Sequence, residues 1–132
     1  MDTVWLAVNG TLMRGLALEG NLRAVGASFL REDKTEKAYR LYSIRDEHPA
    51  MVRVAADDPA AVSVAVEVWA VPKAGLAEVL LREPAGLSVG KVKLQSGETV
   101  LGVIAEPLLT AGAKEISAYG GWRAYIEAER RE

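Results

Sequence analysis

Alternation of apolar and polar side chains is strongest between residues 62 and 71, where the chain reads VSVAVEVWAV. Valines occupy every second position from residue 62 to 68, and the positions between them include Glu67 and Trp69. A period of two is typical of a strand whose two faces meet different surroundings. The segment TVWLAV, residues 3–8, is apolar on both parities instead. It predicts a strand that is covered on both faces.

Other segments have weaker patterns that still predict elements. Helical spacing, with a proline or a glycine pair near two of the starts, predicts helices over residues 16–26, 72–83 and 120–132. Runs of β-branched and aromatic residues between turn signals predict strands over residues 26–32, 37–44 and 51–55, and two more within 89–107 around the turn QSGE. Several strands, few helices and short connections indicate an α+β fold with a mixed sheet or a small open barrel.

Composition indicates one ordinary folded domain, residues 1–132. Hydrophobic residues make up 50% of the chain, and its 16 basic and 18 acidic residues are scattered, with a net charge of −2. This balance argues against a nucleic-acid partner. The chain lacks cysteine and has one histidine, His48, which excludes thiolate chemistry and multi-histidine metal sites. We expect no metal and no cofactor.

Apolar segments in this sequence are short. None reaches the roughly 18 consecutive residues that a membrane-spanning helix requires. The expected location is therefore the cytoplasm, without attachment to a membrane.

Several stretches carry a family resemblance. The motif NGTLMRG, residues 9–15, resembles the Tyr-Gly-Thr-Leu-type opening of the gamma-glutamylcyclotransferase-like superfamily. The closest likeness within that superfamily is to the C-terminal domain of allophanate hydrolase, and it follows the same order along the chain. It rests on YRLYSI, MVRVA, VEVWAVP, EPAGLSVGKVKLQSGETVLGVIAEP and SAYGGWRAYIEA.

The resemblance implies a barrel-like α+β domain with an anion-binding cavity at the end of the first strand. In the cyclotransferases, backbone N–H groups of the opening loop hold a γ-glutamyl group. Here Asn9 and Gly10 allow an unusual backbone turn, and the amides of Gly10, Thr11 and Leu12 are predicted to form a nest for a carboxylate. The Thr11 hydroxyl offers a further donor.

Both catalytic bases implied by the resemblance fall on other residue types. The cyclotransferase Glu-Gly pair aligns with Ala85-Gly86, and Glu83, two residues earlier, is either a substitute base or a solvated carboxylate at a helix end. The histidine implicated in the allophanate hydrolase domain aligns with Leu12. His48, far along the chain, is expected to be a surface histidine without a role rather than a relocated base.

Glu67 is a second candidate for proton transfer. It lies in the middle of a predicted strand among valines, where an ionised carboxylate needs a partner. If its face lines a cavity, burial raises its pKa and suits it to acid–base chemistry. The alternative is a structural carboxylate paired with Arg53 or Arg40 on a neighbouring strand.

Two arginines are candidates for binding an anionic substrate. Arg53 and Arg123 lie in stretches shared with the hydrolase domain, and the arginine fork suits a carboxylate or carbamate. Each is open to the alternative role of a structural ion pair. Tyr119, next to a glycine pair, is expected in a cavity wall or in the core. Arg14 is expected to be solvated or to support the anion loop from outside.

These residues lead to one preferred function and two alternatives. The preferred hypothesis is a stand-alone domain of urea or nitrogen metabolism that binds a small carboxylate or carbamate and assists its breakdown, with Glu67 or an ordered water moving the proton. One alternative is a non-catalytic accessory module for an amidase encoded elsewhere. The other is a gamma-glutamylamine cyclotransferase that uses Glu83. A homodimer is left open.

Overall fold

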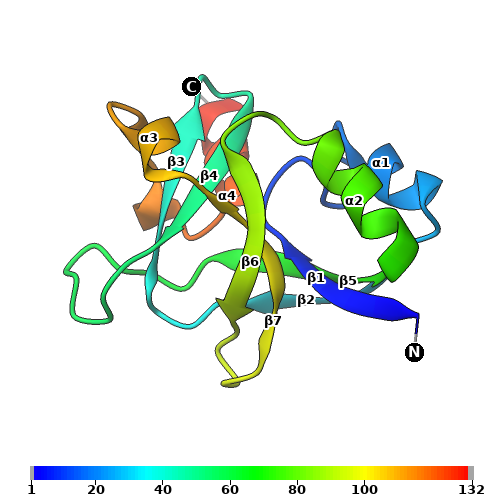
Figure 1. Ribbon diagram of the computed structural model, residues 1–132. Coiled ribbons are helices and arrows are strands. Elements are labelled where there is room, and N and C mark those ends of the chain that lie inside the picture. Colours follow the sequence, from blue (N-terminus) through cyan, green and yellow to red (C-terminus); the bar gives the residue numbers. More distant parts are fainter. Residues whose placement is uncertain (1, 131–132) are drawn as a thin grey trace.

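The computed structural model describes residues 2–130 and has the predicted α+β architecture (Figure 1). Five strands form a mixed sheet in the order β2-β5-β1-β7-β6, in which only the β1–β7 pair is parallel. A smaller antiparallel sheet has the order β4-β3-β8. The described strands are β1 (Thr3–Val8), β2 (Ser28–Lys34), β3 (Tyr39–Ile44), β4 (His48–Arg53), β5 (Ala65–Pro72), β6 (Leu87–Lys93), β7 (Thr99–Ala105) and β8 (Lys114–Glu115).

The helices lie on two sides of these sheets. Helices α1 and α2 lie beside each other, whereas α3 lies next to β3 and β4 (Figure 1). The helical segments within residues 2–130 are α1 (Glu19–Ala24), α2 (Lys73–Leu81), α3 (Pro107–Thr110), the 3-10 helix η1 (Ser117–Tyr119) and α4 (Trp122–Arg130). Over the same residues, no helix has both the length and the apolarity needed to cross a membrane.

The two faces of β5 are buried in different surroundings, which accounts for the alternation in its sequence. Trp69 is fully buried in the main core, which also contains the rings of Tyr39 and Tyr125. On the opposite face, Val66 and Val68 belong to a smaller apolar cluster. The strand therefore uses its two side-chain rows in two separate clusters.

Some boundaries and exposures differ from the expectations. Strand β1 is fully covered only in its second half, and Trp5 is 40% exposed. Strand β5 begins at Ala65, because Val62 makes only an isolated bridge to Tyr39. Helix α4 is confirmed, although residues 131–132 of the predicted helix lie outside the described residues. The short elements α3, β8 and η1 were not predicted.

Two features of this fold position the functional residues. The register of β1 against β5 places Val8 opposite Glu67, so the loop after β1 starts beside that carboxylate. Strand β4 starts at His48 and includes Pro49, which the sequence pattern had placed in a loop.

Candidate functional site

The opening loop turns sharply after β1 and returns toward α1. The Met13 N–H donates to the Gly10 carbonyl at 2.9 Å, and the Leu18 N–H donates to the Thr11 carbonyl at 2.8 Å. The expected unusual backbone at Gly10 is not found, because its φ is not positive. Glycine is required there for space: a Cβ on Gly10 would lie 2.5 Å from Cδ of Pro49.

The predicted amide donors lie at the tip of this loop. Among residues 2–130, the N–H groups of Gly10, Thr11 and Leu12 donate no hydrogen bond. The Asn9 side chain is committed to the structure instead, because its Nδ2 donates to the Val103 carbonyl at 3.0 Å. Asn9 therefore holds the loop against β7, and the three amides at the loop tip are without an acceptor within residues 2–130.

A small cavity of about 10 Å³ lies against this loop, with room for about one water molecule. It is bordered by the end of β1, the start of β4 and the turn after α2. Its lining residues are Val8, Asn9, Gly10, Thr11, Leu12, His48, Pro49, Glu83, Leu87 and Val103. The free amides and two titratable side chains, His48 and Glu83, thus share one enclosed space.

Glu83 is the carboxylate of this cavity. Its Oε2 is buried and has no hydrogen-bond partner among the described residues. Burial raises the pKa of Glu83 to about 7. The expectation of a solvated carboxylate at a helix end is therefore wrong for Oε2, although the residue as a whole is only half-buried.

His48 also differs from expectation. It is 6% exposed and lines the same cavity, so it is not a surface histidine. Its Nδ1 lies 3.0 Å from the carbonyl oxygen of Pro49. Sequence reasoning missed this residue because the segment RDEHPA reads as a polar loop, and no periodicity marks His48 as the first residue of a strand.

Glu67 occupies a different environment, in which each oxygen is paired. Its Oε1 accepts hydrogen bonds from the Arg14 backbone N–H at 2.9 Å and from Trp69 Nε1 at 3.2 Å. Its Oε2 accepts from Arg14 Nε and Arg123 Nη2, both at 3.1 Å. Glu67 is 2% exposed, and four hydrogen bonds satisfy its buried carboxylate.

The charge state of Glu67 follows from these contacts. Burial alone would raise its pKa, but the backbone N–H of Arg14 and the side chains of Trp69, Arg14 and Arg123 outweigh burial and lower the pKa. The predicted raised pKa is wrong. The predicted pairing with Arg53 or Arg40 is also wrong, because the partners come from the opening loop and from α4.

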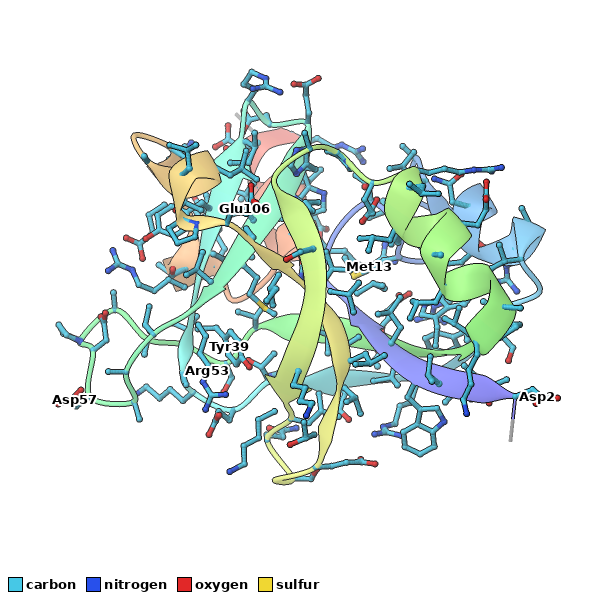
Figure 2. All side chains as sticks on the ribbon, viewed as in Figure 1. Asp2, Met13, Tyr39, Arg53, Asp57 and Glu106 are labelled. Carbon is cyan, nitrogen blue, oxygen red and sulfur yellow. The ribbon has the colours of Figure 1, made fainter. Side chains whose placement is uncertain are left out.

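The remaining candidates for substrate binding, Arg123, Tyr119 and Arg53, lie in two different parts of the structure. Arg123 and Tyr119 line a groove of about 400 Å³ that also contains Glu67, and neither borders the small cavity. Arg53 is at the far end of β4 from His48, where it pairs with Glu36 at 3.1 Å. Figure 2 shows Arg53 beside Tyr39, away from Met13 of the opening loop.

Arg14 supports the opening loop from outside, which is one of its two expected roles. Its guanidinium bonds to Glu67 and Glu32 and lies 3.6 Å from the ring centroid of Phe29. Arg123 also supports the loop, because its Nη2 donates a hydrogen bond to the Arg14 carbonyl. Within residues 2–130, no three histidine or acidic side chains gather into a group that would hold a metal ion.

Comparison with known proteins adds a family to this geometry. The model of the allophanate hydrolase C-terminal domain matches residues 4–127. The chain belongs to this family. The predicted relation is thereby confirmed, and the stretches that carried it span nearly the whole matched region.

Several known proteins are similar to this chain over almost all of its length. Protein c4763 of uropathogenic Escherichia coli is 51% identical, with a TM-score of 0.91, over 96% of this chain and 98% of its own. Kluyveromyces lactis allophanate hydrolase is 31% identical, with a TM-score of 0.90, over 97% of this chain and 22% of its own. Lachancea kluyveri urea amidolyase is 34% identical over 99% of this chain and only 7% of its own length.

A more distant match shows the wider fold. A mouse AIG2-like protein is 16% identical, with a TM-score of 0.59, over 83% of this chain. At this identity the likeness concerns architecture alone. It agrees with the superfamily that the opening motif indicated.

Two positions that the resemblance singled out can now be placed in the structure. Leu12, the expected counterpart of the implicated histidine, is 2% exposed and packs in the main core. Ala85 aligns with the cyclotransferase glutamate, but the carboxylate that reaches the cavity belongs to Glu83. The turn LREPAG therefore supplies an acidic group to the cavity with an offset of two residues from the expected position.

Proposed function

We propose that this domain binds a small carboxylate or carbamate in the cavity at the end of β1 and transfers a proton to it from Glu83. The observation that carries the proposal is the buried, unpartnered Oε2 of Glu83 in the cavity lined by Gly10, Thr11 and Leu12. A carboxyl group with a pKa of about 7 exchanges protons readily at neutral pH. This assigns to Glu83 the role that the sequence had offered to Glu67.

The two parts of the cavity have complementary tasks in this proposal. The amides of the loop tip stabilise the anionic carboxylate, as successive N–H groups do in backbone nests. Glu83, in its acid form, donates a proton to the nitrogen that loses carbon dioxide. Carbamate breakdown needs both, because the carboxylate must be oriented while the departing nitrogen gains a proton.

Entry of a ligand requires the cavity to widen. Its volume of about 10 Å³ is far below that of a typical small-molecule site, roughly 300 Å³ or more. The ring of Pro49 stands directly against Gly10 and closes one wall. Separation of the start of β4 from the loop tip would open this wall without disturbing the contacts of Glu67.

Malonate, a stable dicarboxylate, tests the proposal. An anion binds beside Glu83 more readily when that carboxyl is protonated, so affinity should fall as the pH rises through about 7. If only the acid form binds, malonate should bind about tenfold more weakly at pH 8 than at pH 6. Titrations followed by amide NMR signals would report both affinity and location at Gly10, Thr11 and Leu12.

Two variants complete this experiment. Glu83→Gln keeps a neutral group in place and should bind malonate with little dependence on pH. Glu78→Gln removes a half-exposed carboxylate of α2 that pairs with Arg82, and it should behave as the parent protein. Malonate that leaves the loop-tip amides unchanged, or an affinity in the parent that is independent of pH, would contradict the proposal.

A cyclotransferase activity is the second candidate, and the position of Glu83 favours it. That reaction needs a base near the α-amine of a γ-glutamyl compound, and Glu83 is the carboxylate that borders the anion-binding loop. The expected result is release of 5-oxoproline from a γ-glutamylamine, lost in Glu83→Gln. No release by the parent protein at high enzyme concentration would eliminate this candidate.

A partner amidase is the third element of the proposal. The chain spans 22% of the K. lactis allophanate hydrolase and 7% of the L. kluyveri urea amidolyase, so in both the domain is attached to a much longer protein. We propose that this domain acts together with an amidase. Co-elution of the two purified proteins in size-exclusion chromatography is the expected result, and separate elution at micromolar concentration would count against it.

A further inference from the structure

His48 is the second titratable group in the cavity, and nothing in the proposed mechanism yet uses it. It is buried at the start of β4, and Pro49 beside it forms the wall that closes on Gly10. Thr11 and Glu83 border the same space. The buried His48 therefore borders the same cavity as the opening loop and the acid.

The contacts of the imidazole determine which nitrogen is available. A carbonyl oxygen can only accept, so Nδ1, at 3.0 Å from the Pro49 carbonyl, must carry a proton. The neutral ring then has its lone pair on Nε2. No described residue forms a hydrogen bond with Nε2. The backbone thus fixes the tautomer and leaves one nitrogen for chemistry.

We propose that His48 is a second proton-transfer group of this cavity and returns to Glu83 the proton that Glu83 donates. This inference rests on the proposed function, because it assigns a partner to the same acid. The cavity has room for about one water between the groups that line it, which suffices to carry a proton from Nε2 to the carboxylate.

The proton balance for a carbamate is simple. The C–N bond breaks, its electron pair remains on nitrogen, and carbon dioxide leaves. The nitrogen takes the proton of the Glu83 carboxyl group, which leaves a carboxylate. Nε2 of the neutral His48 ring then takes up a proton from solvent and passes it to that carboxylate. One proton from solvent is consumed in each cycle, as the loss of carbon dioxide from a carbamate anion requires.

The test uses the fact that His48 is the single histidine of the chain. Long-range ¹H–¹⁵N spectra of the imidazole report its tautomer and charge without ambiguity. The parent protein should show the tautomer protonated at Nδ1. In Glu83→Gln, the ring signals should shift, because the carboxyl group that exchanges a proton with the imidazole is replaced by an amide. Glu78→Gln is the matched control and should leave the ring signals unchanged.

A second variant measures the role of His48 in binding. His48→Asn keeps a side-chain N–H that can reach the Pro49 carbonyl, and it removes Nε2. Loss of the hydrogen bond that Nε2 donates to the anion after taking up a proton should weaken malonate binding at pH 6 about tenfold. An affinity equal to that of the parent protein would contradict the inference. The spectra above need no change at His48, so they decide the matter even if His48→Asn does not fold.

The outcomes separate the two proposals. If malonate shifts the loop-tip amides but the His48 signals respond neither to malonate nor to Glu83→Gln, this inference is wrong and the proposed function stands. If His48 responds to Glu83→Gln while malonate shifts no amide, the coupling of the two groups stands and the proposed anion site is wrong. An imidazole protonated at Nε2 alone would also overturn the inference.

Discussion

Glu67, which is buried, and Glu83, which is half-buried, are two carboxylates next to the same loop, and their surroundings are opposite. Glu67 accepts hydrogen bonds on both oxygens, from the backbone and side chain of Arg14, from Trp69 and from Arg123. Glu83 has a buried oxygen that accepts none from residues 2–130. The pKa of Glu67 is lowered, whereas burial raises that of Glu83 to about 7.

This difference shows that burial alone does not mark a proton-transfer group. At Glu67, preorganised donors hold the anion and make protonation unfavourable, so the residue serves as an anchor for the opening loop and α4. At Glu83, the loss of water is uncompensated, so the carboxyl group keeps its proton up to a pKa of about 7. A carboxyl group without partners suits the proposed proton transfer, and the paired carboxylate of Glu67 supports the opening loop.

The largest expected effect on stability is at Glu67, which anchors the opening loop and α4. Glu67→Gln should lower the free energy of unfolding at pH 7 by about 3 kcal/mol, because two arginines lose their buried partner. The arginines are 40% and 45% exposed, which keeps the loss below that of a wholly buried pair. Urea denaturation measures it, and Glu78→Gln, whose ion pair is half exposed, should lose less than about 0.5 kcal/mol.

The pH dependence of this loss has a definite sign. The folded-state pKa of Glu67 lies below 4.5, the ordinary pKa of a glutamate. Its ionised form therefore gives stability that is present above pH 4.5 and is lost as the pH falls through the folded pKa. The difference between Glu67→Gln and the parent protein should therefore shrink in acid. If Glu67→Gln keeps full stability but no longer binds malonate, Glu67 is a proton-transfer group and not an anchor.

Much of the fold could be predicted from the sequence because periodicity reports local structure. The alternation at residues 62–71 predicted β5, and the glycine pair with its following amphipathic run predicted α4. The elements α3, β8 and η1 contain four, two and three residues, too few for a period to be recognised. The burial of Glu67 was foreseeable from its valine neighbours.

The candidate site was less predictable, since its contacts join distant parts of the chain. The arginines that pair with Glu67 are 53 and 56 residues away, and no local pattern identifies them. Glu83 follows a helix and precedes a proline, a setting that usually exposes a carboxylate, and its inward direction depends on how the turn meets the opening loop. His48 reaches the cavity through the register of β3 and β4, which the sequence does not specify.

The second prediction concerns Glu83, whose buried Oε2 has no hydrogen-bond partner among the described residues. Glu83→Gln should stabilise the protein at pH 8 by about 2 kcal/mol and have little effect at pH 5. The sign follows because the folded pKa of Glu83, about 7, lies above 4.5, the ordinary pKa of a glutamate. The folded state therefore binds the proton more tightly than the unfolded state, and stability declines as the pH rises between these values. Urea denaturation at both pH values measures the effect, and equal stability changes at pH 5 and 8 would contradict it.

The smallest expected effect tests the wall that closes the cavity. Gly10→Ala should lower the free energy of unfolding by about 1–2 kcal/mol, since the new Cβ would lie 2.5 Å from Cδ of Pro49. Thermal or urea denaturation measures this loss. The Arg14 and Arg123 contacts with Glu67 involve neither Gly10 nor Pro49, so they should persist.

Gly20→Ala is the matched control, because a Cβ on Gly20 meets nothing within 4 Å and the residue lies inside α1. That change should be neutral or stabilising by roughly 0.5–1 kcal/mol. If close contact with Pro49 is the cause of the loss, Pro49→Ala in the Gly10→Ala background should restore stability, since it removes the ring atoms Cγ and Cδ. An unrestored double variant would mean that Gly10 is needed for its backbone rather than for the space it leaves, and the closing wall of the Glu83 cavity would have to be sought elsewhere.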